Sequence, residues 1–181
     1  LHFPDYDEDR EAIIERSRKA GVGTFINVGT DVASSEAALR LAHQYPFVHA
    51  TAGIHPHDAK DAQDDDFKAM ERLLHESKVV AIGEVGLDFF RNLSPNDVQK
   101  KVLNRFVELY RKTLKPLVLH VRAAYKEIKE QIQSELSSPV KGLLHCFSSD
   151  KETMKEFLDL GFYISFAGPL TYKKNDVLRE A

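Results

Sequence analysis

Short apolar runs alternate with amphipathic segments along the whole of this sequence. Six runs are rich in β-branched and aromatic residues and have the length of buried strands, and each is followed by a segment whose apolar residues recur at helical spacing. The predicted strands cover residues 24–29, 47–54, 79–84, 117–121, 141–147 and 162–167. The first helix is predicted to follow residue 7. Further helices are predicted over 32–44, 94–112, 125–136 and 149–160, and two more are predicted to begin at 64 and at 175.

Local signals mark the ends of several of these helices. Asp31 is a predicted N-cap, because its carboxylate can accept a hydrogen bond from the free N–H groups of a first helical turn. Pro46 ends the same helix. Ser94 is expected to cap the long helix that follows it, with Pro95 in the first turn, and Asn175 is expected to cap the last helix.

The order of the elements predicts an α/β fold. Strands and helices that alternate in series indicate parallel strands joined by right-handed crossovers, and nearly continuous apolar strands indicate a sheet buried on both faces. An open doubly wound sheet and a (β/α) barrel both satisfy this pattern. No Gly-x-Gly-x-x-Gly sequence follows a strand, which argues against a dinucleotide-binding open sheet. With no linker or low-complexity segment, residues 1–181 are expected to form a single domain.

Composition excludes some classes of function but does not select one. The formal net charge of −3 argues against a surface that coats DNA through many phosphate contacts, but not against an enzyme that holds one or two phosphates through cations. No apolar run approaches the roughly 20 residues that span a bilayer, so no membrane partner is expected. The single cysteine, Cys146, excludes an internal disulfide and suits a cytoplasmic location. It is expected to be a buried, inert thiol that points away from the face of His145.

Three polar residues lie at or near the ends of otherwise apolar strands. Glu84, His120 and His145 are separated by 36 and 25 residues, about one strand–helix unit each. Because the C-terminal ends of parallel strands meet at one rim, where barrel enzymes gather their catalytic groups, we expect the three side chains to converge. One carboxylate and two neutral imidazoles form a common ligand set for a divalent cation that activates water. The alternative for each residue alone is a hydrogen-bonded core histidine or a surface ion pair.

Five further residues are candidates for substrate binding near the same rim. His55 and His57 either orient a phosphate or form a structural turn with one buried and one exposed ring. Arg91 either grips a phosphate with its planar guanidinium or pairs with Asp88. Arg122, two residues after the strand-end histidine, carries the same choice.

These motifs, taken in order, resemble the TatD-like family of metal-dependent deoxyribonucleases. The matching segments are Asn27–Asp31, Gly53–His57, Gly83–Arg91, His120–Arg122, His145–Ser148 and Gly161–Pro169. The resemblance covers nearly the whole chain and implies a TIM-type (β/α) barrel that hydrolyses DNA ends with two divalent cations, Mg²⁺ or Mn²⁺, with Zn²⁺ as an alternative. By position it implies that Glu84 bridges the cations and that His120 and His145 complete the ligands of one of them.

The sequence departs from the family pattern at both ends. About six of the eight strand–helix units are present, while the first strand, with its His-x-His pair, and the last strand, with its Asp, are absent. Val121 and Ala124 also replace polar residues. The resemblance therefore implies one complete metal site in this chain. Because the first and last strands of a closed barrel are neighbours, two edges are left open, and we expect either a longer protein or a second copy to cover them.

Three functions follow from these residues. The first is a deoxyribonuclease, acting as an exonuclease on DNA through a metal-activated water. The second is an amide or ester hydrolase on the same barrel, because acyl and phosphoryl substrates differ in pocket walls rather than in metal ligands. The third is a catalytically impaired chain that acts only as a binding module.

Overall fold

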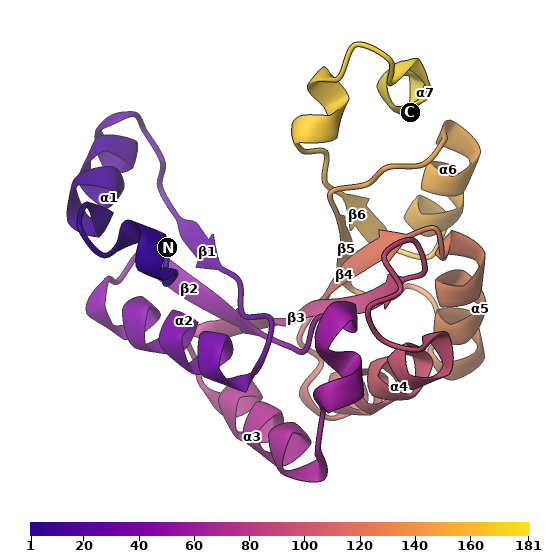
Figure 1. Ribbon diagram of the computed structural model, residues 1–181, viewed down its shortest axis with the longest axis horizontal. Helices are drawn as coiled ribbons and strands as arrows, with labels where there is room; N and C mark the ends of the chain where they lie inside the picture. The colour runs from indigo at the N-terminus through magenta and orange to yellow at the C-terminus, as the bar shows by residue number, and fades with distance from the viewer.

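A single sheet of six parallel strands organises the computed structural model, which describes all 181 residues (Figure 1). The strands are β1 (Phe25–Asn27), β2 (Val48–Ala52), β3 (Val79–Asp88), β4 (Leu117–Arg122), β5 (Gly142–His145) and β6 (Phe162–Ile164). The α-helices are α1 (Arg10–Lys19), α2 (Val32–Gln44), α3 (Asp64–His75), α4 (Asn96–Thr113), α5 (Tyr125–Glu135), α6 (Lys151–Asp159) and α7 (Asp176–Glu180). Three short 3₁₀ helices are η1 (Pro4–Tyr6), η2 (Pro56–Asp61) and η3 (Gly168–Thr171).

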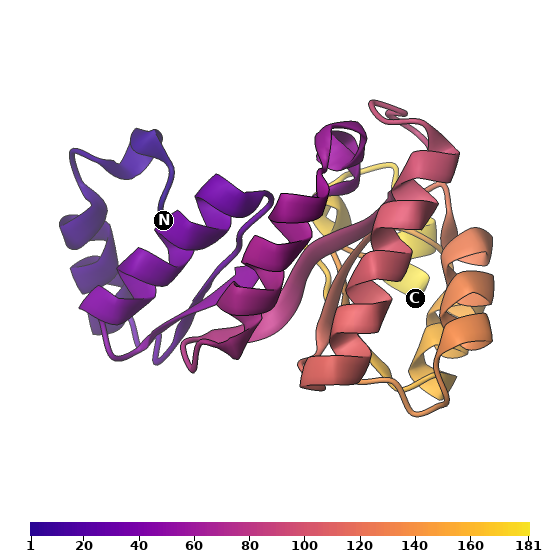
Figure 2. The ribbon, with the colours of Figure 1, turned by 90° about the horizontal axis from the view of Figure 1, so that it is seen from below.

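The order of the strands distinguishes between the two predicted architectures. The strands lie side by side in chain order from β1 to β6, whereas a doubly wound sheet reverses its order at a switch point. Each crossover therefore moves to the next position in the same direction, as in a (β/α) barrel. The sheet curves into an open half-barrel with its long helices along the outer face (Figures 1 and 2). No helix is both long enough and apolar enough to cross a bilayer.

The core lies between this sheet and the helices outside it. A cluster of 34 buried hydrophobic residues joins the sheet to its helices, and helix α4 contributes Leu103, Phe106 and Val107 to it. Full burial of one such side chain stabilises the fold by roughly 1.5–3 kcal/mol. The two edge strands are open, and their middle residues, Ile26 and Tyr163, are 59% and 77% exposed.

The structure confirms some of the local predictions. Helix α2 has the predicted bounds, and Asp31 caps it by accepting a hydrogen bond from the Ser34 N–H at 2.7 Å. Strands β1, β2, β5 and β6 are shorter than predicted, whereas β3 runs four residues beyond Glu84. Gly86 permits this extension, because a Cβ there would collide with the backbone carbonyl of His120 on β4.

Three predictions about local structure are wrong. The Ser94 hydroxyl does not cap α4; it donates to the His57 carbonyl at 2.8 Å and accepts from the Lys60 N–H, which ties η2 to the start of α4. Asn175 occupies the N-cap position of α7, but its side chain makes no capping hydrogen bond and donates to the carbonyl of Pro169 instead. Cys146 does not alternate with His145: β5 ends at the histidine, and Cys146 is half-buried in a left-handed conformation.

Candidate functional site

The polar residues predicted at strand ends lie on one rim of the sheet. Gly86, His120 and His145 are aligned across β3, β4 and β5, so the two histidines occupy neighbouring positions on adjacent strands. Glu84 reaches the same row, where the His120 Nδ1–H donates to its Oε1 at 3.1 Å. Glu84 itself lies where the register of β3 against β4 shifts, between Ile82 and Val85, and its side chain there contacts His120, 36 residues away in sequence.

A cluster of three histidines forms the centre of this rim. His55, His57 and His120 each offer one ring nitrogen, and these nitrogens all lie within 4.8 Å of one another. Two nitrogens at about 2.0–2.1 Å from one cation are at most about 4.2 Å apart, so small side-chain rotations would place all three on a single ion. The donor chemistry and the spacing therefore fit a divalent cation, with the Glu84 carboxylate beside the cluster.

His145 is not a member of that cluster. Its side chain is exposed and has no hydrogen bond or ion pair. It still acts on the cluster at longer range. Burial by itself raises the pKa of the Glu84 carboxyl, but the hydrogen bond from His120 and the electrostatic influence of the nearby His145, His120 and His55 rings lower the pKa below its ordinary value. Of the three residues predicted as ligands, the structure joins Glu84 to His120 and leaves His145 at the edge.

The protonation of the cluster is set by burial and by two carboxylates. Burial and the neighbouring charge of His120 lower the pKa of His55 to about 4, so His55 is neutral at pH 7 and its lone pair is available to a metal. Burial also acts to lower the pKa of His120, but hydrogen bonds to Glu84 and Asp88 raise it above its ordinary value. A metal that binds His120 must therefore displace a proton.

Asp88 is placed as a positioning residue rather than as a substrate ligand. Its side chain is fully buried, and Oδ2 accepts hydrogen bonds from Nε2–H of His57 at 2.8 Å and of His120 at 3.1 Å. Oδ1 accepts from the backbone N–H groups of Phe90 and Arg91. Burial tends to raise the pKa of Asp88, and these hydrogen bonds lower it to about 2. A carboxylate behind a histidine fixes the orientation and tautomer of the ring.

The ion pair between Asp88 and Arg91, one of the two alternatives for Arg91, does not form between their side chains. Only the Arg91 backbone contacts the carboxylate, and the exposed guanidinium has no ion-pair partner. Sequence reasoning missed the residue that holds Asp88 from behind, which is Gln99. This fully buried amide accepts from the Asp88 N–H at 2.7 Å and donates to the carbonyls of Asp88 and Ser94. A polar residue within the apolar stripe of a predicted helix was the available signal.

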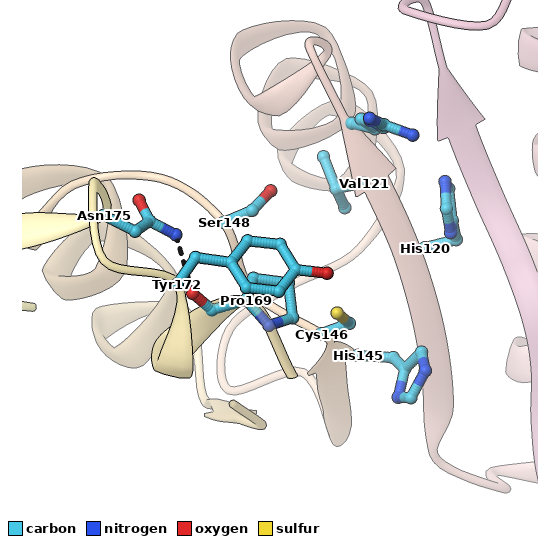
Figure 3. Close-up of a pocket in the computed structure, with 9 residues that line it drawn as sticks. His120, Val121, His145, Cys146, Ser148, Pro169, Tyr172 and Asn175 are labelled. Atoms are coloured by element: carbon cyan, nitrogen blue, oxygen red, sulfur yellow. Dashed lines mark hydrogen bonds between the residues drawn. The ribbon is translucent and has the colours of Figure 1, made fainter. Parts of the chain in front are cut away.

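A cavity of about 460 Å³ adjoins the cluster on the side of β4 and β5 (Figure 3). It is lined by His120, Val121, Arg122, His145, Cys146, Ser148, Pro169, Tyr172 and Asn175. The guanidinium of Arg122 lies 4.1 Å from the centre of the Phe90 ring, a cation–π contact that leaves it without an acidic partner. Cys146 and His145 both line this cavity. Burial raises the pKa of the Cys146 thiol.

Comparison with known proteins identifies the family of this chain. The model of the TatD-related DNases matches residues 1–181. A protein of Bacillus subtilis named uncharacterized metal-dependent hydrolase YabD is 35% identical over 173 residues, which are 96% of this chain and 68% of that protein. The 3'-5' ssDNA/RNA exonuclease TatD of Salmonella typhimurium is 33% identical over 93% of this chain and 65% of its own length.

A solved structure agrees with these matches. The crystal structure of the TatD homologue YJJV of Escherichia coli superimposes with a TM-score of 0.89 at 29% identity, over 99% of this chain and 71% of that one. The chain spans about two thirds of the length of the curated relatives named here. Strand order, rim chemistry and similarity over the whole chain agree, and the chain belongs to the family of TatD-related deoxyribonucleases.

Proposed function

We propose that the protein containing this chain is a divalent-metal-dependent phosphodiester hydrolase that releases nucleotides from DNA ends. The observation that carries the proposal is the cluster of His55, His57 and His120, whose ligand nitrogens lie within 4.8 Å of one another beside the Glu84 carboxylate. The names of the relatives, a metal-dependent hydrolase and a 3'-5' ssDNA/RNA exonuclease, support the same class of reaction.

The donor set admits several cations. Imidazole nitrogens suit Zn²⁺, while carboxylate oxygens suit Mg²⁺ and Mn²⁺, so a mixed set of three histidines and Glu84 accommodates each of them. When bound, such a cation polarises a phosphate oxygen and lowers the pKa of an attacking water. The family resemblance implies a second cation, for which His145 at the edge of the cluster is the remaining donor on β5.

The residues around the cluster have separable tasks. Glu84 carries negative charge at neutral pH, because the surrounding histidines lower the pKa of its carboxyl. Asp88 holds His57 and His120 in fixed orientations, so that little reorganisation is needed when the cation binds. Arg122 faces the adjoining cavity with no acidic partner and is suited to bind a substrate phosphate through its planar guanidinium.

The walls of this cavity favour a phosphoryl substrate over an acyl one. Arg122, His120 and His145 line it, and no acidic residue does. A neutral amide or ester gains little from a free guanidinium, whereas a phosphodiester carries the negative charge that pairs with it. This charge pattern supports the nuclease over an amide or ester hydrolase on the same barrel.

The direct test follows nucleotide release from end-labelled single-stranded DNA with Mg²⁺, Mn²⁺ or Zn²⁺, and with a chelator. We expect cation-dependent release and a loss of about 100-fold or more in His120→Ala, because a ligand of the activating ion is removed. His75→Ala, an exposed histidine on α3, is the matched control and should retain activity. A protein that binds the cation but releases no nucleotide with any of the three metals would contradict the proposal.

A further inference from the structure

The cavity beside the histidine cluster has a wall that the hydrolytic chemistry does not require. Its inner wall is formed by the strand ends with His120 and His145, and its outer wall by the η3 segment with Pro169 and Tyr172. Figure 3 shows the Tyr172 hydroxyl directed toward the side of the cavity that holds Cys146 and the two histidines. At about 460 Å³, the cavity has the size of a site for one small ligand, which corresponds to a single nucleotide rather than a duplex.

Tyr172 presents an exposed aromatic ring in the wall of the cavity. The residue is 63% exposed, its ring has no aromatic neighbour and its hydroxyl has no hydrogen-bond partner. Large aromatic side chains are ordinarily buried or paired, so an unpartnered ring in a cavity wall is available to a ligand.

The backbone that carries Tyr172 is held in place. Its N–H donates to the Pro169 carbonyl at 3.1 Å, and its carbonyl accepts from the guanidinium of Arg179 at 2.7 Å. Arg179 also donates to the carbonyls of Leu170 and Lys173 and pairs with Asp176. One guanidinium on α7 thus holds the turn that carries Tyr172, so ligand binding does not have to order this backbone.

Another residue of the cavity wall, Arg122, is suited to bind an anion. Arg122 is fixed over the Phe90 ring and has no carboxylate partner, although the chain as a whole has a net charge of −3. A nearby cavity lined by Asp31, Asp58, Asp61 and Asp66 lacks any cationic residue and would repel a phosphate. The cavity that adjoins the cluster thus combines a cation without an acidic partner with an exposed aromatic ring.

We propose that this cavity holds the terminal nucleotide of the substrate, with its base stacked on Tyr172 and its phosphate at Arg122. The inference rests on the proposed function and adds a requirement to it. The terminal nucleotide must carry a base, but the protein does not distinguish among the bases. Stacking on an aromatic ring tolerates every base, because each has a π face. A binding pocket for one nucleotide beside His120 fits the release of single nucleotides that the proposed function entails.

The first experiment measures binding without turnover. Calorimetric titrations of the full-length protein with dAMP, with deoxyribose 5-phosphate and with inorganic phosphate separate the base from the phosphate. We expect dAMP to bind about 5- to 150-fold more tightly than deoxyribose 5-phosphate, which corresponds to the roughly 1–3 kcal/mol of one stacked base. Tyr172→Leu should abolish this difference and Tyr172→Phe should keep it. Tyr163→Leu, an exposed tyrosine on β6 outside the cavity, is the matched control.

The second experiment measures kcat/KM on oligonucleotides that end in a normal or an abasic nucleotide. The unaltered protein should prefer the normal end by a similar factor, mainly through KM, and Tyr172→Leu should treat the two ends alike. If the protein cleaves DNA while Tyr172→Leu keeps the full preference for a base, the inference is wrong and the proposed function stands. If dAMP binds as expected but no DNA is cleaved with any cation, the nuclease proposal fails and the nucleotide pocket remains. Equal binding of dAMP and deoxyribose 5-phosphate to the unaltered protein overturns the inference directly.

Discussion

Replacement of Asp88 by asparagine isolates the contribution of one buried charge to the histidine cluster. Asparagine has the shape of aspartate, but one of its two oxygens becomes an NH₂ group. The Oδ1 position accepts from two backbone N–H groups, those of Phe90 and Arg91, so the amide oxygen will occupy it. The NH₂ group then faces the Nε2 atoms of both His57 and His120, which are donors in the native protein.

Two donors cannot satisfy each other, so the Nε2 atoms must lose their protons. His57 must then carry its proton on Nδ1, and this change of tautomer alters which nitrogen lone pair it can offer to a cation. Loss of a residue that orients a metal ligand costs about 10- to 100-fold in metal affinity or activity, or about 1.4–2.8 kcal/mol. We therefore expect Asp88→Asn to fold and to bind Mn²⁺ or Zn²⁺ more weakly by that factor.

The assay is a calorimetric titration with each cation, combined with NMR titration of the histidine rings. The pKa of His120, which the Asp88 charge helps to raise, should fall in the variant. Asp97→Asn is the matched control, since Asp97 is exposed on α4 and pairs only with Lys101. Metal affinity within twofold of the unaltered protein, together with an unchanged His120 pKa, would refute the view that Asp88 organises the cluster.

Three further outcomes are expected. Phe106→Ala removes a fully buried ring from the core and should lower the free energy of unfolding by about 3–5 kcal/mol in denaturant titration, whereas a loss below 1 kcal/mol would show that the core can collapse around the site. The depressed pKa of Asp88, about 2 in the folded protein against about 3.9 unfolded, should contribute stability that is complete above pH 5 and lost as pH falls toward 2. The free energy of unfolding of Asp88→Asn, measured over the same acid range, should lack this pH-dependent component. An identical slope of unfolding free energy against pH in the two proteins would contradict the prediction. Gly86→Ala should strongly reduce the yield of folded protein or its melting temperature, because the added Cβ meets the His120 carbonyl from a positive φ; wild-type stability by circular dichroism would contradict the close pairing of β3 with β4.

The amino-acid sequence by itself determined the class of fold. Alternation of apolar strands with amphipathic helices is a local property, so the six strands, the helices and the cap at Asp31 could be identified from short windows. Strand ends were less certain, because tertiary contacts decide them. The extension of β3 past Glu84 depends on a glycine that lets the His120 carbonyl approach, a contact between residues 34 apart.

Local sequence also misled where one polar side chain had a choice of partners. Ser94 and Asn175 have the chemistry of helix caps, but each finds a partner outside its helix, His57 and Pro169 respectively. Such a choice depends on which carbonyl the fold brings near, and no sequence window contains that information.

The sequence also determined which polar residues lie near the site, because polar groups at the ends of parallel strands lie on the same rim of the sheet. Only the tertiary structure decided their grouping. His55 and His57 join His120 in the cluster, His145 stays at its edge, and Asp88 turns inward to hold two of the rings. The physical reason is that the direction of a side chain at a rim depends on sheet register, on curvature and on loops that cross above it. These are properties of packing between distant segments, and they arise only when the chain is folded.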